Sequence, residues 1–348
     1  MHDQATEWRW VQRYAEQFRA CNLQPGEVVV LLSEAASKKE IVETARMALE
    51  MSGAAVADVR MPTPPNPGPV PIRSTGASQA LAGHRGAVAA CAAADFVVDC
   101  TVEGLLHAVE RAEILAGGSR VLMISAEHPE NVERWPHDPS LKDRVDRGTA
   151  MLEAAAVMTV TSVAGTDLRV DLNGAIRAGS YGWCTEPGSI AHWPGGLVLC
   201  FPAAETVNGT VVLAPGDVNL TFKDYIREPI TLTFVDDYVT EIAGDGHDAN
   251  LMRSYLSSFD ESDAYAVSHV GWGMNQGARW DSLPMWDKSE HNGTELRAFA
   301  GNFLISTGAN EHAGRFCRGH FDLPMRNCTV ALDGDVIVEA GGLRADLT

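Results

Sequence analysis

The chain has 348 residues, of which 45% are hydrophobic and 21% are charged, and its formal net charge is −19. This is ordinary globular composition in a chain long enough for more than one hydrophobic core, which excludes a largely disordered protein. The negative charge and the lack of Lys/Arg runs argue against nucleic-acid binding. No stretch approaches the roughly 18 apolar residues that span a bilayer, so we expect no membrane segment.

The cysteines and the amino-terminal segment indicate the cellular compartment in which we expect the protein. The seven cysteines are odd in number and form no CxxC pair, which indicates reduced thiols rather than a disulfide framework. Residues 1–17 are polar, and no basic stretch precedes an apolar run there, so no signal peptide is expected. We therefore expect a cytoplasmic protein.

The first part of the chain alternates short apolar runs, typical of buried strands, with helical patterns. Strands are predicted over residues 26–32, 54–60, 96–100 and 120–125. Helices are predicted over residues 37–51, 87–94 and 105–115, and a proline-rich loop over 62–71. Strands that alternate with helices form a parallel sheet covered by helices, so residues 1–155 are predicted to be a Rossmann-like α/β scaffold domain. No glycine-rich nucleotide fingerprint follows its first strand.

From about residue 156 the hydrophobic pattern changes to a period of two, which is typical of half-buried strands. Such strands are predicted over residues 167–172, 209–213 and 230–234. Turn residues predict hairpins at Asp236-Asp237 and at Asp333-Gly334. One helix is predicted over residues 249–259. The fold class is therefore an α/β parallel-sheet domain followed by a β-rich α+β metal-binding domain over residues 156–348.

The strongest chemical signal is the run His320-Phe321-Asp322. Residues two apart in a strand project from one face about 7 Å apart, so an imidazole and a carboxylate can converge on one ion. His269, in a segment flanked by glycines, is the third candidate ligand. Two histidines and a carboxylate leave positions open for substrate and O₂ on Fe(II), and the same set can hold Zn²⁺ for hydrolysis. The spacing alone is also compatible with a surface strand that carries a salt bridge.

Four further positions carry side chains suited to chemistry. Glu186 and His192 lie in a segment dense in turn formers, where they can hydrogen-bond a polar ring, although a tight turn with a packed histidine is the simpler interpretation. His107, at the predicted start of a helix, can act as a general base if the two domains face each other across the site. Ser306 follows an apolar strand, and its hydroxyl can reach a ligand or cap a turn.

Three runs in the second half of the chain form a recognisable pattern: SHVGWG at 268–273, GNFLISTG at 301–308 and HFDLPMRNC at 320–328. This pattern resembles the 2,5-dihydroxypyridine 5,6-dioxygenase family of bacterial nicotinate and nicotine degradation. The likeness extends upstream through residues 186–188, 192–194 and 222–225, and more faintly through residues 97–99 and His107, so that it covers most of the chain.

The resemblance implies an Fe(II)-dependent dioxygenase that takes a small aromatic substrate and O₂, opens the pyridine ring between C5 and C6 and gives N-formylmaleamate. The implied iron ligands are His269, His320 and Asp322. The implied catalytic base is His107, with His192 as the other candidate. The implied substrate-binding residues are Glu186, His192 and Ser306. The family's fold is related to a clan of metalloaminopeptidases, and the family likeness suggests a homo-oligomer.

Two other functions stay open at the level of sequence. A metal-dependent aminopeptidase or amidohydrolase with Zn²⁺ or Co²⁺ would use paired metals bridged by carboxylates. Asp248 and Glu186 are the only further candidates for such ligands, and this shortage favours one metal over two. A non-catalytic binding module would need the His320 and Asp322 pair to be purely structural.

Overall fold

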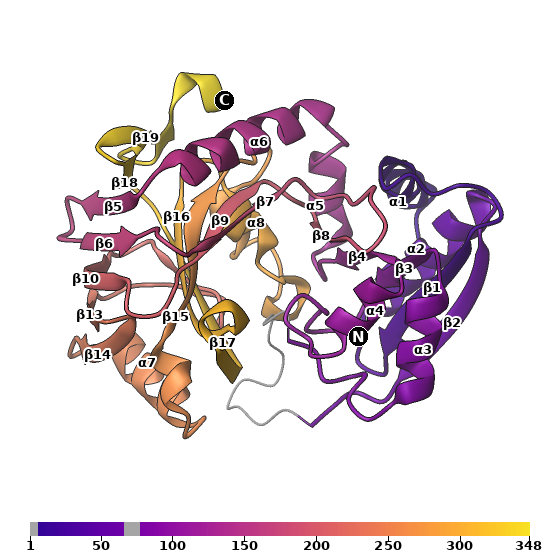
Figure 1. Cartoon of the computed structure of the whole chain (residues 1–348), viewed down its shortest axis with the longest axis horizontal. Coiled ribbons are helices and arrows are strands. Elements are labelled where there is room, and N and C mark those ends of the chain that lie inside the picture. The colour runs from indigo at the N-terminus through magenta and orange to yellow at the C-terminus, as the bar shows by residue number, and fades with distance from the viewer. Residues whose placement is uncertain (1–5, 66–76) are drawn as a thin grey trace.

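A computed structural model describes residues 6–65 and 77–348 of the chain. One side of the molecule is a five-stranded sheet with strand order β2-β1-β3-β4-β8, in which all neighbours are parallel (Figure 1). Its strands are β1 (Val28–Glu34), β2 (Ala55–Met61), β3 (Phe96–Asp99), β4 (Arg120–Ile124) and β8 (Ile190–Trp193). The helices of this part are α1 (Trp8–Ala20), α2 (Lys39–Met51), α3 (Arg85–Ala93) and α4 (Arg111–Ala116).

Both faces of the parallel sheet are covered, and β1 shows why its sequence is a continuous apolar run. Val29 and Leu31 join the core that includes residues of α1 and α2. Val30 and Leu32 point to the other face and join the core that includes residues of α3 and α4. Successive side chains of a strand point to opposite faces, so a strand buried on both sides has apolar residues at every position.

Helices α5 (Pro129–Arg134) and α6 (Pro139–Ala154) lead to the antiparallel part. An eight-stranded sheet has the order β14-β13-β10-β6-β5-β18-β19-β20, and a five-stranded sheet has the order β17-β16-β15-β9-β7. The strands of the larger sheet are β5 (Val157–Ser162), β6 (Asp167–Asp171), β10 (Val207–Leu213), β13 (Ile230–Val235), β14 (Tyr238–Ala243), β18 (Cys328–Leu332), β19 (Asp335–Glu339) and β20 (Gly342–Leu343). The strands of the smaller sheet are β7 (Ile176–Ser180), β9 (Leu197–Phe201), β15 (Val267–Gly273), β16 (Phe303–Asn310) and β17 (Arg315–Met325).

The remaining elements are a short hairpin and two helices. The hairpin joins β11 (Val218–Asn219) and β12 (Asp224–Tyr225), and the helices are α7 (His247–Ser257) and α8 (Thr294–Ala298). Buried side chains of both antiparallel sheets form one large core, which includes Trp272 and Phe321. In Figure 1 this part lies opposite the parallel sheet, with α8 between the two.

The predicted fold class is confirmed, a parallel α/β part followed by a β-rich part. Both predicted hairpins are present, and their turn residues have positive φ, as Asp236 (46°), Asp237 (77°), Asp333 (49°) and Gly334 (90°) show. The chain returns to the parallel sheet at β8, after β5 to β7 have entered the antiparallel sheets. The division near residue 155 stays a prediction.

Two local predictions need comment. The helix expected over residues 105–115 forms only as α4, and its first half is a series of turns, so the prediction that His107 begins a helix is wrong. Of the proline-rich loop, residues 62–65 have no regular structure and the rest lies outside the described residues.

Among the described helices, none is long and apolar enough to cross a membrane.

Candidate metal centre

The three predicted ligands meet on one face of the smaller antiparallel sheet. His269 lies on β15, and His320 and Asp322 lie on β17, with β16 between these strands. The register of β15 against β16 shifts between Val267 and Val270, so the pairing is irregular where His269 lies. Because His320 and Asp322 are two residues apart, both project from the same face. The sheet therefore brings three side chains together from distant parts of the sequence.

The distances fit a shared ion. The His320 Nε2 atom is 3.3 Å from Asp322 Oδ1, and the His269 Nε2 atom is 3.7 Å from the same oxygen. The centroids of the two imidazole rings are 5.1 Å apart. Each residue offers one ligand atom, and these three atoms all lie within 4.8 Å of one another. In the part of the chain that is described, this is the one group of three His, Cys, Asp or Glu residues with such spacing.

Burial and neighbouring charges set the protonation of His269 and Asp322. His269, His320 and Asp322 are 6%, 7% and 3% exposed. Burial lowers the pKa of His269 to about 3, so this ring is neutral near pH 7. Burial alone would raise the pKa of Asp322, but the Arg297 guanidinium and the two imidazoles hold it well below its usual range. A neutral imidazole and an ionised carboxylate are the forms that bind a metal.

Asp322 is positioned by two further side chains. Arg297, on α8, donates a hydrogen bond from Nε to Asp322 Oδ2 at 2.5 Å. Ser306, directly opposite Asp322 in the β16–β17 register, donates its hydroxyl to Asp322 Oδ1. The structure therefore places Ser306, predicted to bind substrate, against a candidate metal ligand. Hydrogen-bonded ligands of this kind are typical of metal sites, where neighbouring groups fix the orientation of the carboxylate.

The residues fit a divalent metal ion. Among the described residues, no group hydrogen-bonds the buried Nδ1 atoms of His269 and His320, and a metal at Nε2 would supply the constraint that such a bond would otherwise give each ring. Two imidazoles and one carboxylate on one face leave coordination positions for exogenous ligands. This arrangement suits Fe(II) oxygen chemistry.

His107, the predicted general base, lies beside this group. Its ring centroid is 5.4 Å from that of His320, and its Nδ1 atom is 3.3 Å from Glu311 Oε1. Burial lowers the pKa of His107, and the hydrogen bond with Glu311 opposes this change only in part. The ring of Phe201 packs edge-on against both His107 and His269, with centroid distances of 6.2 Å and 5.6 Å. His107 is therefore a neutral imidazole next to a candidate ligand.

His192 also reaches the site, through β8. Its Nε2 atom is 3.2 Å from the hydroxyl of Thr294, the first residue of α8. Burial, followed by the positive charge of Arg297, lowers the pKa of His192 to about 3. The parallel sheet thus contributes a neutral histidine to the side on which Arg297 and Asp322 lie.

Glu186 is the predicted site residue that the structure does not bring to this group. Its side chain is exposed and accepts a hydrogen bond of 3.3 Å from the neighbouring Thr185 hydroxyl. The loop that carries Glu186 precedes β8 and pairs with the turn after α4, where Gly188 N donates to Gly118 O at 3.0 Å. This is the amino end of the parallel strands, whereas His192 lies near the carboxyl end of β8. The expected substrate contact of Glu186 is therefore not supported by its position.

Sequence reasoning missed Arg297, Glu311 and Phe201. Arg297 belongs to a five-residue helix, and Glu311 to a single 3₁₀ turn, so neither lies in a pattern that marks a function. Phe201 ends an apolar strand and is indistinguishable in sequence from a core residue. Only their contacts in space identify them.

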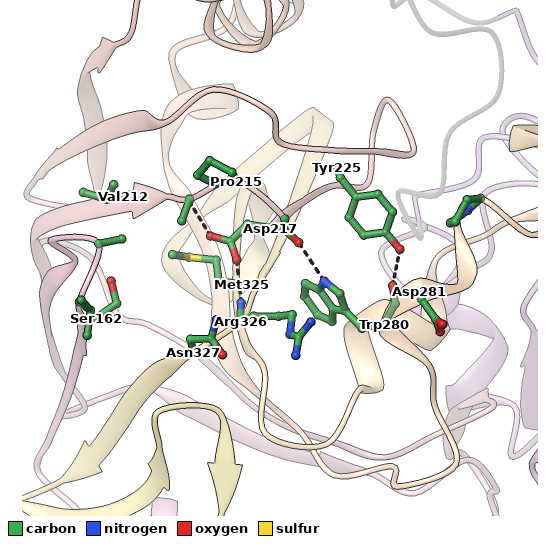
Figure 2. A pocket seen from close by; sticks show the side chains of 15 residues that line it. Ser162, Val212, Pro215, Asp217, Tyr225, Trp280, Asp281, Met325, Arg326 and Asn327 are labelled. Carbon is green, nitrogen blue, oxygen red and sulfur yellow. Dashed lines mark hydrogen bonds between the residues drawn. The ribbon is translucent and has the colours of Figure 1, made fainter.

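A separate pocket lies outside the metal centre. Its volume is about 360 Å³, and its walls include Trp280, Tyr225 and Met325 (Figure 2). Asp217 lines it and accepts hydrogen bonds from the backbone N–H groups of Ala214 and Arg326, at 2.7 Å and 2.8 Å. None of the three candidate ligands lines this pocket, so we do not assign the chemistry to it.

Comparisons with known proteins identify relatives of this chain. The NicX family model, described as 2,5-dihydroxypyridine 5,6-dioxygenase, matches residues 9–345. A 2,5-dihydroxypyridine 5,6-dioxygenase from Pseudomonas putida KT2440 is 38% identical over 268 residues, which cover 76% of this chain and 75% of that protein. The solved structure of 2,5-dihydroxypyridine dioxygenase from Pseudomonas putida KT2440 matches with a TM-score of 0.90 at 33% identity, over 98% of this chain and 99% of that one.

A more distant structure shares the fold alone. Wild-type AmpT from Thermus thermophilus has a TM-score of 0.59 at 14% identity, over 96% of this chain and 99% of that one. The family model, by contrast, spans nearly the whole described chain, including both parts of the fold and all three candidate ligands. The chain therefore belongs to the 2,5-dihydroxypyridine 5,6-dioxygenase family of ring-cleaving oxidoreductases.

Proposed function

We propose that this enzyme uses Fe(II) and O₂ to open the ring of 2,5-dihydroxypyridine, or of a closely related hydroxylated N-heteroaromatic ring, between C5 and C6. The product of the first substrate is N-formylmaleamate. The observation that carries this proposal is the buried group of His269, His320 and Asp322 in a chain of this family. Its two imidazoles and one carboxylate form the ligand set that suits non-haem iron.

The metal ion would supply positions for substrate and O₂ side by side, and it would permit a reaction that is spin-forbidden between an aromatic ring and O₂ alone. The protein's own groups bind, orient and move protons. Arg297 and Ser306 hold the Asp322 carboxylate, so that its charge and direction stay fixed. The Phe201 ring forms an apolar wall beside His107 and His269 that limits the access of water.

His107 is the proposed general base, which takes the proton of the substrate hydroxyl on Nε2. His192 is the weaker candidate because its contacts occupy the ring: Nε2 lies at the Thr294 hydroxyl, and the ring hydrogen-bonds the Pro194 backbone. His192 is better suited to help position the ring of the substrate. Burial keeps both histidines neutral near pH 7, as a base requires.

A hydrolase with paired metals has less support. Such a site needs carboxylates that bridge two ions. Of the residues that the structure describes, only one group of three has the required spacing, and Glu186 and Asp248 are not part of it. Asp248 instead accepts hydrogen bonds from the backbone N–H groups of Arg227 and Glu228.

We also propose a cytoplasmic homo-oligomer. All seven cysteines are buried and none forms a disulfide, which is usual in a reducing compartment. Light scattering on the purified protein measures the assembly, and a monomeric mass would contradict the second part of this proposal.

The test of the activity is O₂ uptake by anaerobically prepared, Fe(II)-loaded protein on addition of 2,5-dihydroxypyridine, with the ultraviolet absorbance of the ring followed in parallel. We expect one O₂ consumed per ring lost, and no turnover by the His320→Ala variant. Uptake without loss of the ring absorbance would contradict ring cleavage. Cleavage of a peptide amide without O₂ would favour the hydrolase instead.

A further inference from the structure

We propose that Glu311 is a positioning residue that fixes the orientation and the tautomer of His107, so that Nδ1 carries the hydrogen and the Nε2 lone pair is directed toward the substrate. This inference rests on the proposed function only for its kinetic consequence. The tautomer itself is a property of the protein without substrate.

The contact between the two side chains is direct. His107 Nδ1 lies 3.3 Å from Glu311 Oε1, and the two residues are 204 positions apart in the sequence. The side chain of His107 is 3% exposed and that of Glu311 is 22% exposed. The carboxylate therefore reaches inward from the surface to a ring that is itself buried beside a candidate metal ligand.

The backbone around Glu311 is well fixed. Glu311 opens the 3₁₀ turn Glu311–Ala313, and Asn310 caps this turn by accepting a hydrogen bond from Ala313 N at 3.2 Å. The Asn310 amide also donates to Pro202 O at 2.9 Å, which ties the turn to the end of β9. Glu311 can therefore serve as a fixed reference for the imidazole.

The charge of Glu311 determines the tautomer. Burial raises the pKa of Glu311, but the hydrogen bond with His107 and the positive charge that this ring carries when it is protonated in acid outweigh this effect and bring the pKa to about 2. An ionised carboxylate has no proton to donate, so a hydrogen bond with it requires an N–H at Nδ1. A neutral imidazole with its hydrogen on Nδ1 has its lone pair on Nε2, which is the state that a base needs.

The other neighbours of the His107 ring do not favour one tautomer over the other. Phe201 and His320 contact the ring at centroid distances of 6.2 Å and 5.4 Å. Packing of this kind restrains the plane of the ring but does not distinguish nitrogen from carbon. Of the contacts that the structure describes for His107, the one with Glu311 is the hydrogen bond that separates the two ring orientations.

The first measurement reads the tautomer without any need for turnover. ¹⁵N chemical shifts of histidine in the metal-free protein distinguish the two tautomers, and the His107→Gln variant identifies the His107 signals. We expect the hydrogen on Nδ1 in the wild type and a mixture of tautomers in Glu311→Gln, because the amide can accept or donate. A hydrogen on Nε2 in the wild type, or an unchanged tautomer in Glu311→Gln, would overturn the proposal.

The second measurement is a double-mutant cycle on ring cleavage. Glu311→Gln should lower kcat about 10- to 100-fold, which is at or below the roughly 10²- to 10⁴-fold contribution of a general base because His107 itself is still present, with KM and bound iron changed less than about twofold. In the His107→Gln background the same substitution should change kcat less than about twofold. Equal losses in the two backgrounds would show that Glu311 does not act through His107.

Controls separate this inference from the proposed function. Glu16→Gln makes the same chemical change in an exposed ion pair with Arg13 and should leave kcat and the His107 signals unchanged. If the wild type does not open the ring, the proposed function fails, while the ¹⁵N measurement still decides the tautomer.

Discussion

At the scale of single residues, the site depends on how each charge is compensated. Asp322 is 3% exposed, yet it stays ionised because Arg297, Ser306 and the two imidazoles surround it. Burying a carboxylate is costly unless it is paired and hydrogen-bonded. The acidic group is therefore prepared for a cation before any metal binds.

Asp217, in the separate pocket of Figure 2, has a raised pKa, whereas the pKa of Asp322 is lowered. Burial raises its pKa to about 6, and the backbone N–H groups of Arg326 and Ala214 counteract this only in part. The folded-state pKa lies above that of an unfolded aspartate, about 4, so folding favours the protonated form. Protonated Asp217 therefore stabilises the folded state fully below pH 4, and this stabilisation is lost as the pH rises through 6.

This titration gives a pH-dependent prediction. We compare the free energy of unfolding of the wild type with that of Asp217→Asn. Between pH 4 and pH 7 the difference, wild type minus variant, should fall by about 3 kcal/mol, because the pKa of Asp217 differs by about two units between the folded and unfolded states. Urea denaturation of the metal-free proteins at several pH values measures it. Asp335→Asn, at an exposed position, is the matched control. A difference that does not vary with pH would contradict the assignment.

At the scale of elements, the pairing of β16 with β17 determines where His320 lies. Gly308 stands opposite His320 in the register and has a φ of 113°. A Cβ atom at this position would lie 2.0 Å from the Gly319 carbonyl oxygen, which is backbone and cannot rotate away. The glycine is therefore required for the close approach of the two strands.

Replacing Gly308 with alanine should displace the segment that carries His320. We expect a loss of about 2–4 kcal/mol in stability, from the unfavourable φ and the backbone clash, together with weaker metal binding. Thermal unfolding and Fe(II) titration measure the two effects. Gly86→Ala lies in α3 with no atom within 4 Å of the added Cβ and should not destabilise the protein. Wild-type stability and metal affinity in Gly308→Ala would contradict this role.

Local patterns account for what the sequence could predict about these elements. Strands β1, β3 and β4 were recognisable because their sequences are largely continuous apolar runs. The pair His320 and Asp322 was recognisable because residues two apart in a strand share a face. The membership of β8 in the parallel sheet was not predictable, because the pairing of Met123 with His192 joins strands far apart in the chain. The position of Glu186 was not predictable for a similar reason, because the pairing of β8 with β4 decides at which end of the parallel sheet its loop lies.

At the scale of the whole molecule, the parallel sheet and the antiparallel part meet at Glu127 and α8. Glu127, just after β4, is 1% exposed and accepts hydrogen bonds from the backbone N–H groups of Asn292, Gly293 and Thr294 at 3.1, 2.7 and 2.7 Å. These residues lead into α8, which carries Arg297 to Asp322. The parallel sheet therefore supports the candidate metal centre through this contact, and the loop after β3 and strand β8 bring His107 and His192 to the same site.

This connection predicts an effect at a distance. Glu127→Gln leaves a buried N–H group facing an amide NH₂, which should cost about 1–3 kcal/mol and loosen α8. We expect lower thermal stability and weaker Fe(II) binding, although Glu127 is not one of the candidate ligands. Glu130→Gln changes an exposed side chain in the same segment and serves as the control. Unchanged metal affinity in Glu127→Gln would show that α8 is held in place by other contacts.

The most direct test of the central claim is the equilibrium binding of Fe(II), under anaerobic conditions, to the wild type and to His269→Ala, His320→Ala and Asp322→Asn. We expect one ferrous ion per wild-type chain, since one group of candidate ligands is present among the described residues, and at least a tenfold loss of affinity in each variant. Wild-type affinity in any of the three variants would contradict the assignment of that residue as a ligand. Unaltered binding in all three would place the iron, and with it the chemistry, elsewhere in the molecule.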